Sequence, residues 1–355
     1  MIPSLGKEYK IQSEEERHLW STYLVFIILS SLTGDSIILL ASVRRNTFKL
    51  NKLVVVVVQH IAVADLIRTV SFVLPTAVSL SADRWVLGDV LGHVTYFLDF
   101  YSYQTSNILI SVLTSTKLLI LKYPTKARFW SEKGAHLVCA CVWIFCFFST
   151  GLLFVGNSGI AFNYILYKIY LVQRNLWIIY TYTAFATIFP TLAVILTTIP
   201  TIRYLIKAAK TSNRAGGQIR WQGMVTVTAT ATVHCVFTLP NLLAVLIYQL
   251  LPKENQAVHF ERATHFVTAL KIMCNFNIYC LTISSFRQFI KSQVRKILIG
   301  LLQCCSYHCR SRDNAAGSGS ELEDTGTDCR PTYWDRAETA ATSIRVLSQD
   351  IQSSN

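Results

Sequence analysis

The sequence has few charged residues for its length. Only 15% of its 355 residues are Asp, Glu, Lys or Arg, whereas 52% are hydrophobic and the mean hydropathy is positive. Length alone suggests about two soluble domains, and this composition argues against them. Apolar runs of roughly 20 residues, the length that crosses a bilayer core, recur along most of the chain. The sequence therefore predicts one polytopic membrane domain with a polar tail.

Other features are missing as well. All ten cysteines lie in apolar runs or in the tail, so no extracellular disulfide is predicted. The polar first 20 residues contain no apolar core preceded by positive charge and no Asn-x-Ser/Thr site, so we expect the first span to act as the signal anchor. The net charge of +13 comes from short basic clusters beside apolar runs, which argues against nucleic acid as a partner.

Histidines suitable for a metal site are not grouped. His60, His234 and His265 fall in separate apolar runs without the spacing of metal ligands. We therefore expect no metal, no cofactor and no enzymatic activity. His60 and His234 are expected to be hydrogen-bonded packing residues.

The apolar runs predict seven spans, at residues 21–43, 53–80, 92–121, 135–156, 177–203, 224–250 and 262–284. Loops after the first, third and fifth spans are richer in Lys and Arg than the alternate loops, which places the amino terminus outside and the tail in the cytosol. The predicted fold class is an all-α membrane protein, a seven-transmembrane helix bundle over residues 21–284 behind an extracellular segment 1–20. The third span carries many small polar groups and should lie inside the bundle, because unpaired polar groups in lipid are costly.

Two further segments follow the seventh span. Residues 285–301 combine apolar and basic positions at helical spacing, which predicts an amphipathic helix in contact with membrane lipid. Cys304, Cys305 and Cys309 come next, either as palmitoylation sites or as ordinary reduced thiols. Residues 302–355 are predicted to be a disordered cytoplasmic tail, and phosphorylation of its hydroxyls would provide a partner site for arrestin.

Several short motifs occur in an order typical of one family. The sequence contains His60-Ile-Ala-Val-Ala-Asp65-Leu, Trp85-Val-Leu-Gly88, Trp143, Pro190, Pro240 and Asn275-Phe-Asn-Ile-Tyr279-Cys. Residues 22–300 thereby resemble a rhodopsin-like (class A) G-protein-coupled receptor. Phe276, where the family usually has proline, resembles invertebrate FMRFamide-type neuropeptide receptors.

The chain departs from the family at two places. Thr116-Lys117-Leu118 replaces the Asp-Arg-Tyr motif at the inner end of the third span, and Gly92 replaces the expected cysteine. In the family the arginine is held by its neighbouring acid at rest, and Thr116 cannot form such a pair. Lysine also lacks the planar fork of arginine, so the resting state is expected to be weakly held. The resemblance implies a G-protein face at Lys117, Lys207 and Tyr279.

Buried charge gives the most specific expectation. The resemblance places a sodium-binding acid at Asp65, with Ser106 and Asn275 at two of the usual liganding positions. Lys271 lies one helical turn before Asn275, and its ammonium could replace the ion, because charges within the membrane are costly unless paired. We expect a polar cluster with little sensitivity to sodium, formed by Asp35, Asp65, Ser106, Lys271 and Asn275; alternatively, Lys271 extends to a water-filled cavity.

The ligand site is expected between the outer halves of the spans. Asp99 lies where the resemblance to amine receptors places a carboxylate for a cationic ligand, and internal pairing with a neighbour such as His265 is the alternative. The expected ligand-binding residues are Asp99, Tyr96, Tyr103, Tyr182, Asn241 and His265, although each aromatic could instead be a packing residue. Lys271 is two residues past the retinal lysine of opsins, about 200° around the helix, and should point away from such a pocket.

The resulting prediction is a plasma-membrane receptor for an extracellular ligand, a cationic amine or, in preference, a peptide, that signals to heterotrimeric G proteins. The first alternative is a receptor-like protein that does not couple to G proteins, for example a scavenger or arrestin-biased receptor. A transporter or channel is the second, although no inverted repeat supports it.

Overall fold

The computed structural model describes residues 4–5, 13–43, 52–123, 131–154, 159–163, 167–172, 176–211, 217–250, 255–296 and 298–299. Residues Met1–Arg295 form one compact unit, and Lys296–Asn355 form a second. The fold and the candidate site belong to the first unit. Cys304, Cys305, Cys309 and the rest of the tail lie outside the described residues.

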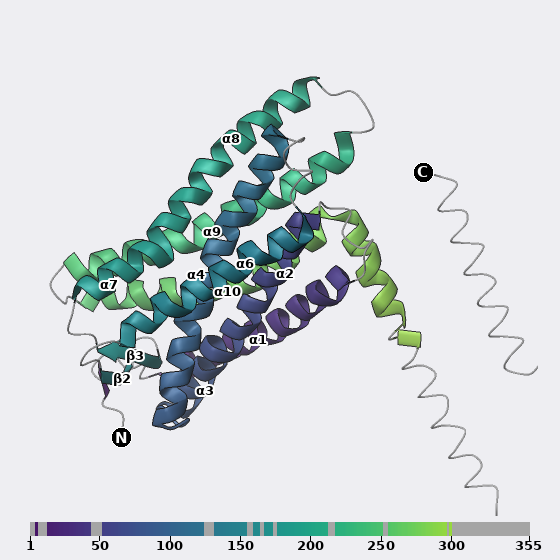
Figure 1. Ribbon diagram of the computed structural model, residues 1–355. Coiled ribbons are helices and arrows are strands. Elements are labelled where there is room, and N and C mark those ends of the chain that lie inside the picture. Colours follow the sequence, from purple (N-terminus) through teal and green to yellow (C-terminus); the bar gives the residue numbers. More distant parts are fainter. Residues whose placement is uncertain are drawn as a thin grey trace, which may run out of the picture. The chain divides into compact units, whose positions relative to one another are not determined.

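Each predicted span coincides largely with a helical segment, although the spans 135–156 and 262–284 extend two residues past the ends of theirs. In chain order these segments are α1 (Glu14–Val43), α2 (Lys52–Arg68) continued by η2 (Thr69–Val73) and α3 (Leu74–Ala82), α4 (Asp89–Lys122), α6 (Glu132–Gly151) continued by η3 (Leu152–Phe154), α7 (Leu176–Thr183) continued by η4 (Ala184–Ile188) and α8 (Phe189–Thr211), α9 (Gly217–Leu250) and α10 (Asn255–Thr282). Figure 1 labels the α-helices of these segments on a ribbon coloured along the sequence.

Helix α1 begins seven residues earlier than the predicted span. The Ser13 hydroxyl accepts a hydrogen bond from the backbone N–H of Glu16 (3.4 Å), and three glutamates occupy the first turn. A serine cap and acidic residues both stabilise the positive end of a helix dipole. The polar Glu14–Glu16 run, which lowers the local hydropathy, therefore belongs to the helix.

Two of the helices contain π-helical segments shortly before a proline. Segment η2 precedes Pro75, and η4 precedes Pro190. Proline has no N–H to donate and its ring clashes with the preceding turn, so the helix widens there rather than continuing regularly. In both cases the change in helical phase lies beside the polar residues described below.

Helix α4 packs against α2, α6, α8 and α9, so it runs through the interior of this unit. One hydrophobic cluster includes Leu109, Ile110 and Leu113 of α4, and a second surrounds Tyr96. Helices α1 and α10 approach closely at Gly34, where an added Cβ would lie 2.7 Å from Cβ of Phe276. Glycine, which has no Cβ, leaves room here for the Phe276 side chain.

A small sheet was not predicted from the sequence. Strand β2 (Gly159–Asn163) pairs antiparallel with β3 (Lys168–Val172) and parallel with β1 (Ser4–Leu5). Tyr167 beside β3 is fully buried, and its hydroxyl donates to the carboxylate of Asp83 (3.5 Å). The helix bundle is the fold, and the sheet is an addition to it between the fourth and fifth helical segments.

Four described helical segments are long and apolar enough to cross a membrane: Glu14–Val43, Lys52–Ala82, Glu132–Phe154 and Tyr180–Tyr204. Phe266–Thr282 with Ser284–Lys296 meets the same test as a pair bent by 102°. The bend separates the seventh span from the predicted amphipathic helix. The last four carbonyl groups of a helix lack a partner within the helix. The guanidinium of Arg287 donates to one of these at the end of α10, the carbonyl of Cys280 (3.1 Å), and so stabilises the bend.

Candidate functional site

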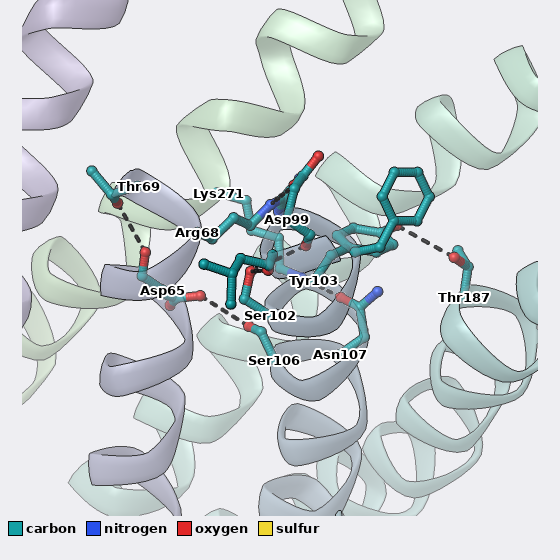
Figure 2. A network of polar contacts seen from close by, with 12 residues as sticks. Asp65, Arg68, Thr69, Asp99, Ser102, Tyr103, Ser106, Asn107, Thr187 and Lys271 are labelled. Carbon is teal, nitrogen blue, oxygen red and sulfur yellow. Dashed lines mark hydrogen bonds and ion pairs between the residues drawn. The ribbon is translucent and has the colours of Figure 1, made fainter. Parts of the chain in front are cut away.

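The polar residues of α4 are buried, as the sequence predicted. Ser102, Gln104, Thr105 and Asn107 are fully buried on this helix. Residues three and four apart lie on the same face of a helix. Asp99, which is also buried, therefore lies on the same face as Ser102 and Tyr103. The facing helices supply the polar partners shown in Figure 2.

Asp99 pairs with Arg68, an arginine that the sequence analysis did not single out. Arg68 Nε lies 3.5 Å from Asp99 Oδ1, and the two side chains are only 6% and 9% exposed. The guanidinium carbon also lies 4.6 Å from the ring centre of Tyr103 and 5.2 Å from that of Phe72. Arginine over aromatic faces is a favourable arrangement, particularly away from water.

This pair changes the expectation for Asp99. The alternative of internal pairing is the arrangement found, with Arg68 rather than His265 as the cation. The side chains of His265 and Asn241 lie outside the described residues. A charged residue within an apolar span is a signal of function or pairing, and Arg68, three residues after Asp65, carries that signal in the sequence.

Asp65 is at the centre of the predicted polar cluster. Its two carboxylate oxygens accept hydrogen bonds from Ser106 (3.0 Å) and Asn275 (2.7 Å), the two residues that the resemblance associated with it. The Thr69 hydroxyl donates to the backbone carbonyl of Asp65 (2.9 Å). The structure thus brings α2, η2, α4 and α10 together at one acid.

Asp35 joins this cluster indirectly. Its carboxylate accepts a hydrogen bond from Ser31 (2.9 Å), and Ser31 also contacts the hydroxyl of Thr69 (2.7 Å). Asp35 is 1% exposed and therefore lies in the protein interior with its sequence-predicted neighbours. Hydroxyls of α1 and η2, rather than an ammonium group, connect the two acids.

Lys271 makes a different contact from the predicted one. Its Nζ donates to Oδ1 of Asn107 (2.6 Å) and lies 5.9 Å from the ring centre of Tyr103. Among the described residues, no carboxylate lies within 4.0 Å of this ammonium group. The direct Lys271 ion pair with Asp65 or Asp35 is absent. Lys271 is nevertheless one turn from Asn275, and its partner Asn107 follows Ser106 directly.

Asn107 connects Lys271 to the widened turn before Pro190. Its Nδ2 donates to the carbonyl of Ala186 (2.9 Å), four residues before the proline. In a regular helix residue 190 would donate to this carbonyl, but proline has no N–H. Ser111 donates to the carbonyl of Pro190 itself (2.8 Å). One amide therefore holds α10 through a lysine and η4 through a backbone carbonyl.

The three tyrosines predicted to bind ligand lie near Asp99. The rings of Tyr96 and Phe100 are 4.4 Å apart, and Phe100 is 5.5 Å from Tyr182. Tyr182 is buried, and its hydroxyl donates to the carbonyl of Phe100 (2.8 Å). The Tyr103 hydroxyl accepts from Thr187 (3.4 Å). Two of these tyrosines thus already take part in contacts between helices.

The residues predicted for the G-protein face differ in exposure. Lys117 and Tyr279 are buried, at 7% and 1% exposure, whereas Lys207 is exposed. Among the described residues, Lys117 has no carboxylate within 4.0 Å. In this conformation, only Lys207 of the three would be accessible to a partner protein.

His60 and His234 are hydrogen-bonded. The indole N–H of Trp143 donates to Nδ1 of His60 (3.1 Å), so the neutral His60 ring carries its proton on Nε2, which lies 3.2 Å from Nδ1 of His136. His234 Nε2 lies 3.4 Å from the hydroxyl of Thr191. Both histidines have the packing role that the sequence predicted.

Comparison with known proteins decides the family. Residues 34–282 match the model of the seven-transmembrane receptors of the rhodopsin family. The chain belongs to this family. It is therefore a multi-pass membrane receptor of the G-protein-coupled class, whose members are generally not enzymes and have extracellular ligands and G proteins as partners.

Individual receptors are similar over most of the chain. Galanin receptor type 2 of Rattus norvegicus is 23% identical over 333 residues, which cover 89% of this chain and 86% of that receptor. The Homo sapiens galanin receptor type 2 is 24% identical over 280 residues, covering 76% and 71%. The uracil nucleotide/cysteinyl leukotriene receptor of Homo sapiens is 24% identical over 152 residues, covering 42% and 40%.

Proposed function

We propose that this receptor is activated by an extracellular peptide and couples to heterotrimeric G proteins at the plasma membrane, with its amino terminus outside. The observation that favours a peptide over a small amine is the ion pair between Arg68 and Asp99. A carboxylate that already faces a guanidinium in a buried site gains less from a second cation, and desolvating that cation is costly. A small monoamine, which depends on such a carboxylate, is therefore disfavoured relative to a peptide with many contacts.

The relatives support the same choice. Galanin, a peptide, gives its name to receptors that are similar to this chain over most of its length. The match to the nucleotide and leukotriene receptor covers less than half of the chain. A peptide ligand is thus favoured by both the site and the extent of similarity.

Transmission would use the contact at Asn107. Its amide joins Lys271 of α10 to Ala186 of η4, so a ligand that moves either helix changes the hydrogen bonds of the other. Agonist binding would shift an equilibrium between two conformations. In the active one, Lys117 and Tyr279 would become accessible to the G protein beside Lys207, with the proline-containing segments as pivots.

The experiment is agonist-independent guanine-nucleotide exchange across a panel of G proteins, with the wild type, Lys117→Arg, Lys117→Ala and Lys122→Ala at equal surface expression. Lys122 is exposed at the end of the same helix and is the matched control. Lys117→Ala should lower nucleotide exchange by about tenfold or more, because the charged hydrogen bond that Lys117 would donate to the G protein is lost. Lys117→Arg and Lys122→Ala should retain it.

A receptor that binds ligand without G-protein coupling is the second candidate. Its support is the Thr116-Lys117-Leu118 sequence, which lacks the arginine of the family, together with the burial of Lys117. Constitutive internalisation without nucleotide exchange by any of the variants, wild type included, would favour this candidate over the first.

The domain boundaries and the tail sites stay proposals. They comprise the extracellular segment 1–20, the transmembrane domain 21–284, the amphipathic helix 285–301 and the cytoplasmic tail 302–355 with its palmitoylation and arrestin sites. The helix Ser284–Lys296 supports the third of these, since Phe286 packs against Phe276 and Tyr279 while Lys291 and Arg295 are exposed.

A further inference from the structure

Three short contacts form a chain between α1 and α2. Asp35 Oδ2 lies 2.9 Å from the Ser31 hydroxyl, and Ser31 lies 2.7 Å from the Thr69 hydroxyl. Thr69 lies 2.9 Å from the backbone carbonyl of Asp65 (Figure 2). All four residues are at most 3% exposed. Each contact has the length of a hydrogen bond between two oxygen atoms, so each needs one hydrogen.

The two hydroxyl groups cannot supply all three hydrogens. A hydroxyl donates one hydrogen bond, and a backbone carbonyl donates none. If Asp35 is a carboxylate, it donates none either, and Ser31 and Thr69 provide two hydrogens for three contacts. One pair of buried oxygens would then lie 2.7–2.9 Å apart with no hydrogen between them. Such a pair is unfavourable, because both atoms carry partial negative charge.

A proton on Oδ2 of Asp35 completes the chain. The carboxyl group then donates to Ser31, Ser31 donates to Thr69, and Thr69 donates to the carbonyl of Asp65. The distance between Asp35 and Ser31 stays the same, and only the donor changes relative to the carboxylate form. Every contact in the chain then contains one hydrogen.

The surroundings of Asp35 also favour a neutral group. Among the described residues, no Lys, Arg or His nitrogen lies within 4.0 Å of its carboxyl group, and its Oδ1 is buried without a hydrogen-bond partner. An ionised carboxylate with one hydrogen bond and no cation is very unfavourable in an apolar interior. The carbonyl oxygen of a neutral acid occupies the same position at lower cost.

The neighbouring acid does not compete for this proton. Helix α1 packs against α2, η2, α3 and α10. Among the described residues, Asp65 of α2 and Tyr279 of α10 are the titratable groups that interact electrostatically with Asp35, and η2 and α3 contain none. Both carboxylate oxygens of Asp65 already accept hydrogen bonds, from Ser106 and Asn275. A single proton on this pair of acids therefore belongs to Asp35.

The charges nearby agree with this assignment. Asp65 and Asp99 are two anions of this region, and Arg68 and Lys271 are two cations. With a neutral Asp35 these groups carry no net charge. An ionised Asp35 would leave one negative charge uncompensated between membrane-spanning helices, which is costly.

We propose that Asp35 is a proton-binding site and that the receptor in this conformation holds one proton on Asp35 Oδ2. The proton links α1, through Ser31, to Thr69 in the π-helical segment η2. A conformation that separates α1 from η2 would lose these contacts and release the proton, so a lower pH favours the conformation in which they are made. This inference goes beyond the proposed function, which does not use Asp35.

The first test is infrared difference spectroscopy on purified full-length receptor at neutral pH, in a detergent without ester groups. The C=O group of a carboxylic acid absorbs apart from carboxylates and amides. Wild-type receptor should show a carboxylic acid band that is absent from Asp35→Asn, an uncharged variant whose amide N–H can donate to Ser31 in the same way. Asp83→Asn is the control and should retain the band, because Asp83 pairs with Arg17 as a carboxylate.

The second test is the pH dependence of the folding equilibrium of the same three proteins in mixed micelles. Above about pH 5 an aspartate in the unfolded chain is ionised. Folding of the wild type therefore takes up one proton at Asp35, and folding of Asp35→Asn takes up none there. Between about pH 5 and about pH 7, the folding equilibrium constant of the wild type should fall about tenfold per pH unit relative to that of Asp35→Asn. The ratio of wild type to Asp83→Asn should stay constant, because a carboxylate takes up no proton on folding.

Each of three results would overturn the proposal: the loss of a carboxylate band instead of a carboxylic acid band in Asp35→Asn, a carboxylic acid band that disappears in Asp65→Asn and remains in Asp35→Asn, or a ratio of wild type to Asp35→Asn that does not change with pH. None of these measurements involves a ligand or a G protein. A failure of the proposed signalling function would therefore leave the proton-binding site standing, and the reverse also holds.

Discussion

Separating Arg68 from Asp99 should destabilise the receptor far more than removing both charges together. The perturbation is a double-mutant cycle of Arg68→Met, Asp99→Leu and the combined variant. Each single change leaves one buried charge without its partner, whereas the combined change leaves an apolar contact of similar volume. The pair is 3.5 Å apart, with side chains only 6% and 9% exposed.

The magnitude follows from burial rather than from distance. Breaking a buried pair from one side costs about 3–5 kcal/mol, while replacing both partners is often neutral. The coupling energy is the difference between the double-variant cost and the two single costs, so its magnitude should be about 6–10 kcal/mol. Arg17 and Asp83 provide a comparison, at 3.2 Å with side chains 22% and 19% exposed. Distance alone would make this second pair about 10% stronger. Exposure to solvent should instead hold its coupling energy to about 0.2–1 kcal/mol.

The assay is equilibrium unfolding of purified receptor in mixed micelles, with the free energy of unfolding measured for both cycles. The loss of ring contacts with Tyr103 in Arg68→Met is common to the single and the combined variant, so it cancels from the coupling energy. Additive effects of Arg68→Met and Asp99→Leu would refute the reasoning. So would a larger coupling energy for the partly exposed pair of Arg17 and Asp83 than for the buried one.

Two further changes test the helix contacts. Gly34→Ala should lower the free energy of unfolding by about 1–3 kcal/mol, because the new Cβ would lie 2.7 Å from Phe276. Gly151→Ala is the control and should lower it by less than about 1 kcal/mol, because nothing lies within 4 Å of the added Cβ. Equal costs for the two variants would show that the α1–α10 contact adjusts easily to the added methyl group. Lys271→Met should make ligand binding or activity sensitive to sodium, because a cation is removed beside the acid cluster. If the Lys271→Met receptor were still insensitive to sodium, the idea that the ammonium replaces the ion would be rejected. Asn107→Leu should lower the free energy of unfolding by about 1–3 kcal/mol, because it leaves the Lys271 ammonium without its acceptor.

The sequence was most informative where apolar patterning and motif spacing act along one helix. Apolar run length located all seven helical segments, and Asp65 contacts Ser106 and Asn275, the two residues that the resemblance associated with it. These contacts follow from the family arrangement of helices, so counting along each span was sufficient. The strands β2 and β3 were missed because their residues alternate only weakly between apolar and polar.

The partners of the buried charges were harder to predict. Arg68, Asp99 and Lys271 each have several possible neighbours on facing helices, and the choice depends on rotation about the helix axis. Asn107 was counted only as one of several polar groups, although it binds Lys271 and the carbonyl freed by Pro190. Sequence spacing gives the face of one helix but not which side chain of another helix it meets.

The π-helical turns at Thr69–Val73 and Ala184–Ile188 have a consequence for any comparison that counts residues outward from a conserved motif. A π turn accommodates about one extra residue, and one residue corresponds to about 100° of rotation in an α-helix. Beyond η2, a position numbered from Asp65 therefore faces a different direction from the same number in a receptor with a regular second helix. Two receptors could share every motif on the inner side and still present different side chains to their ligands.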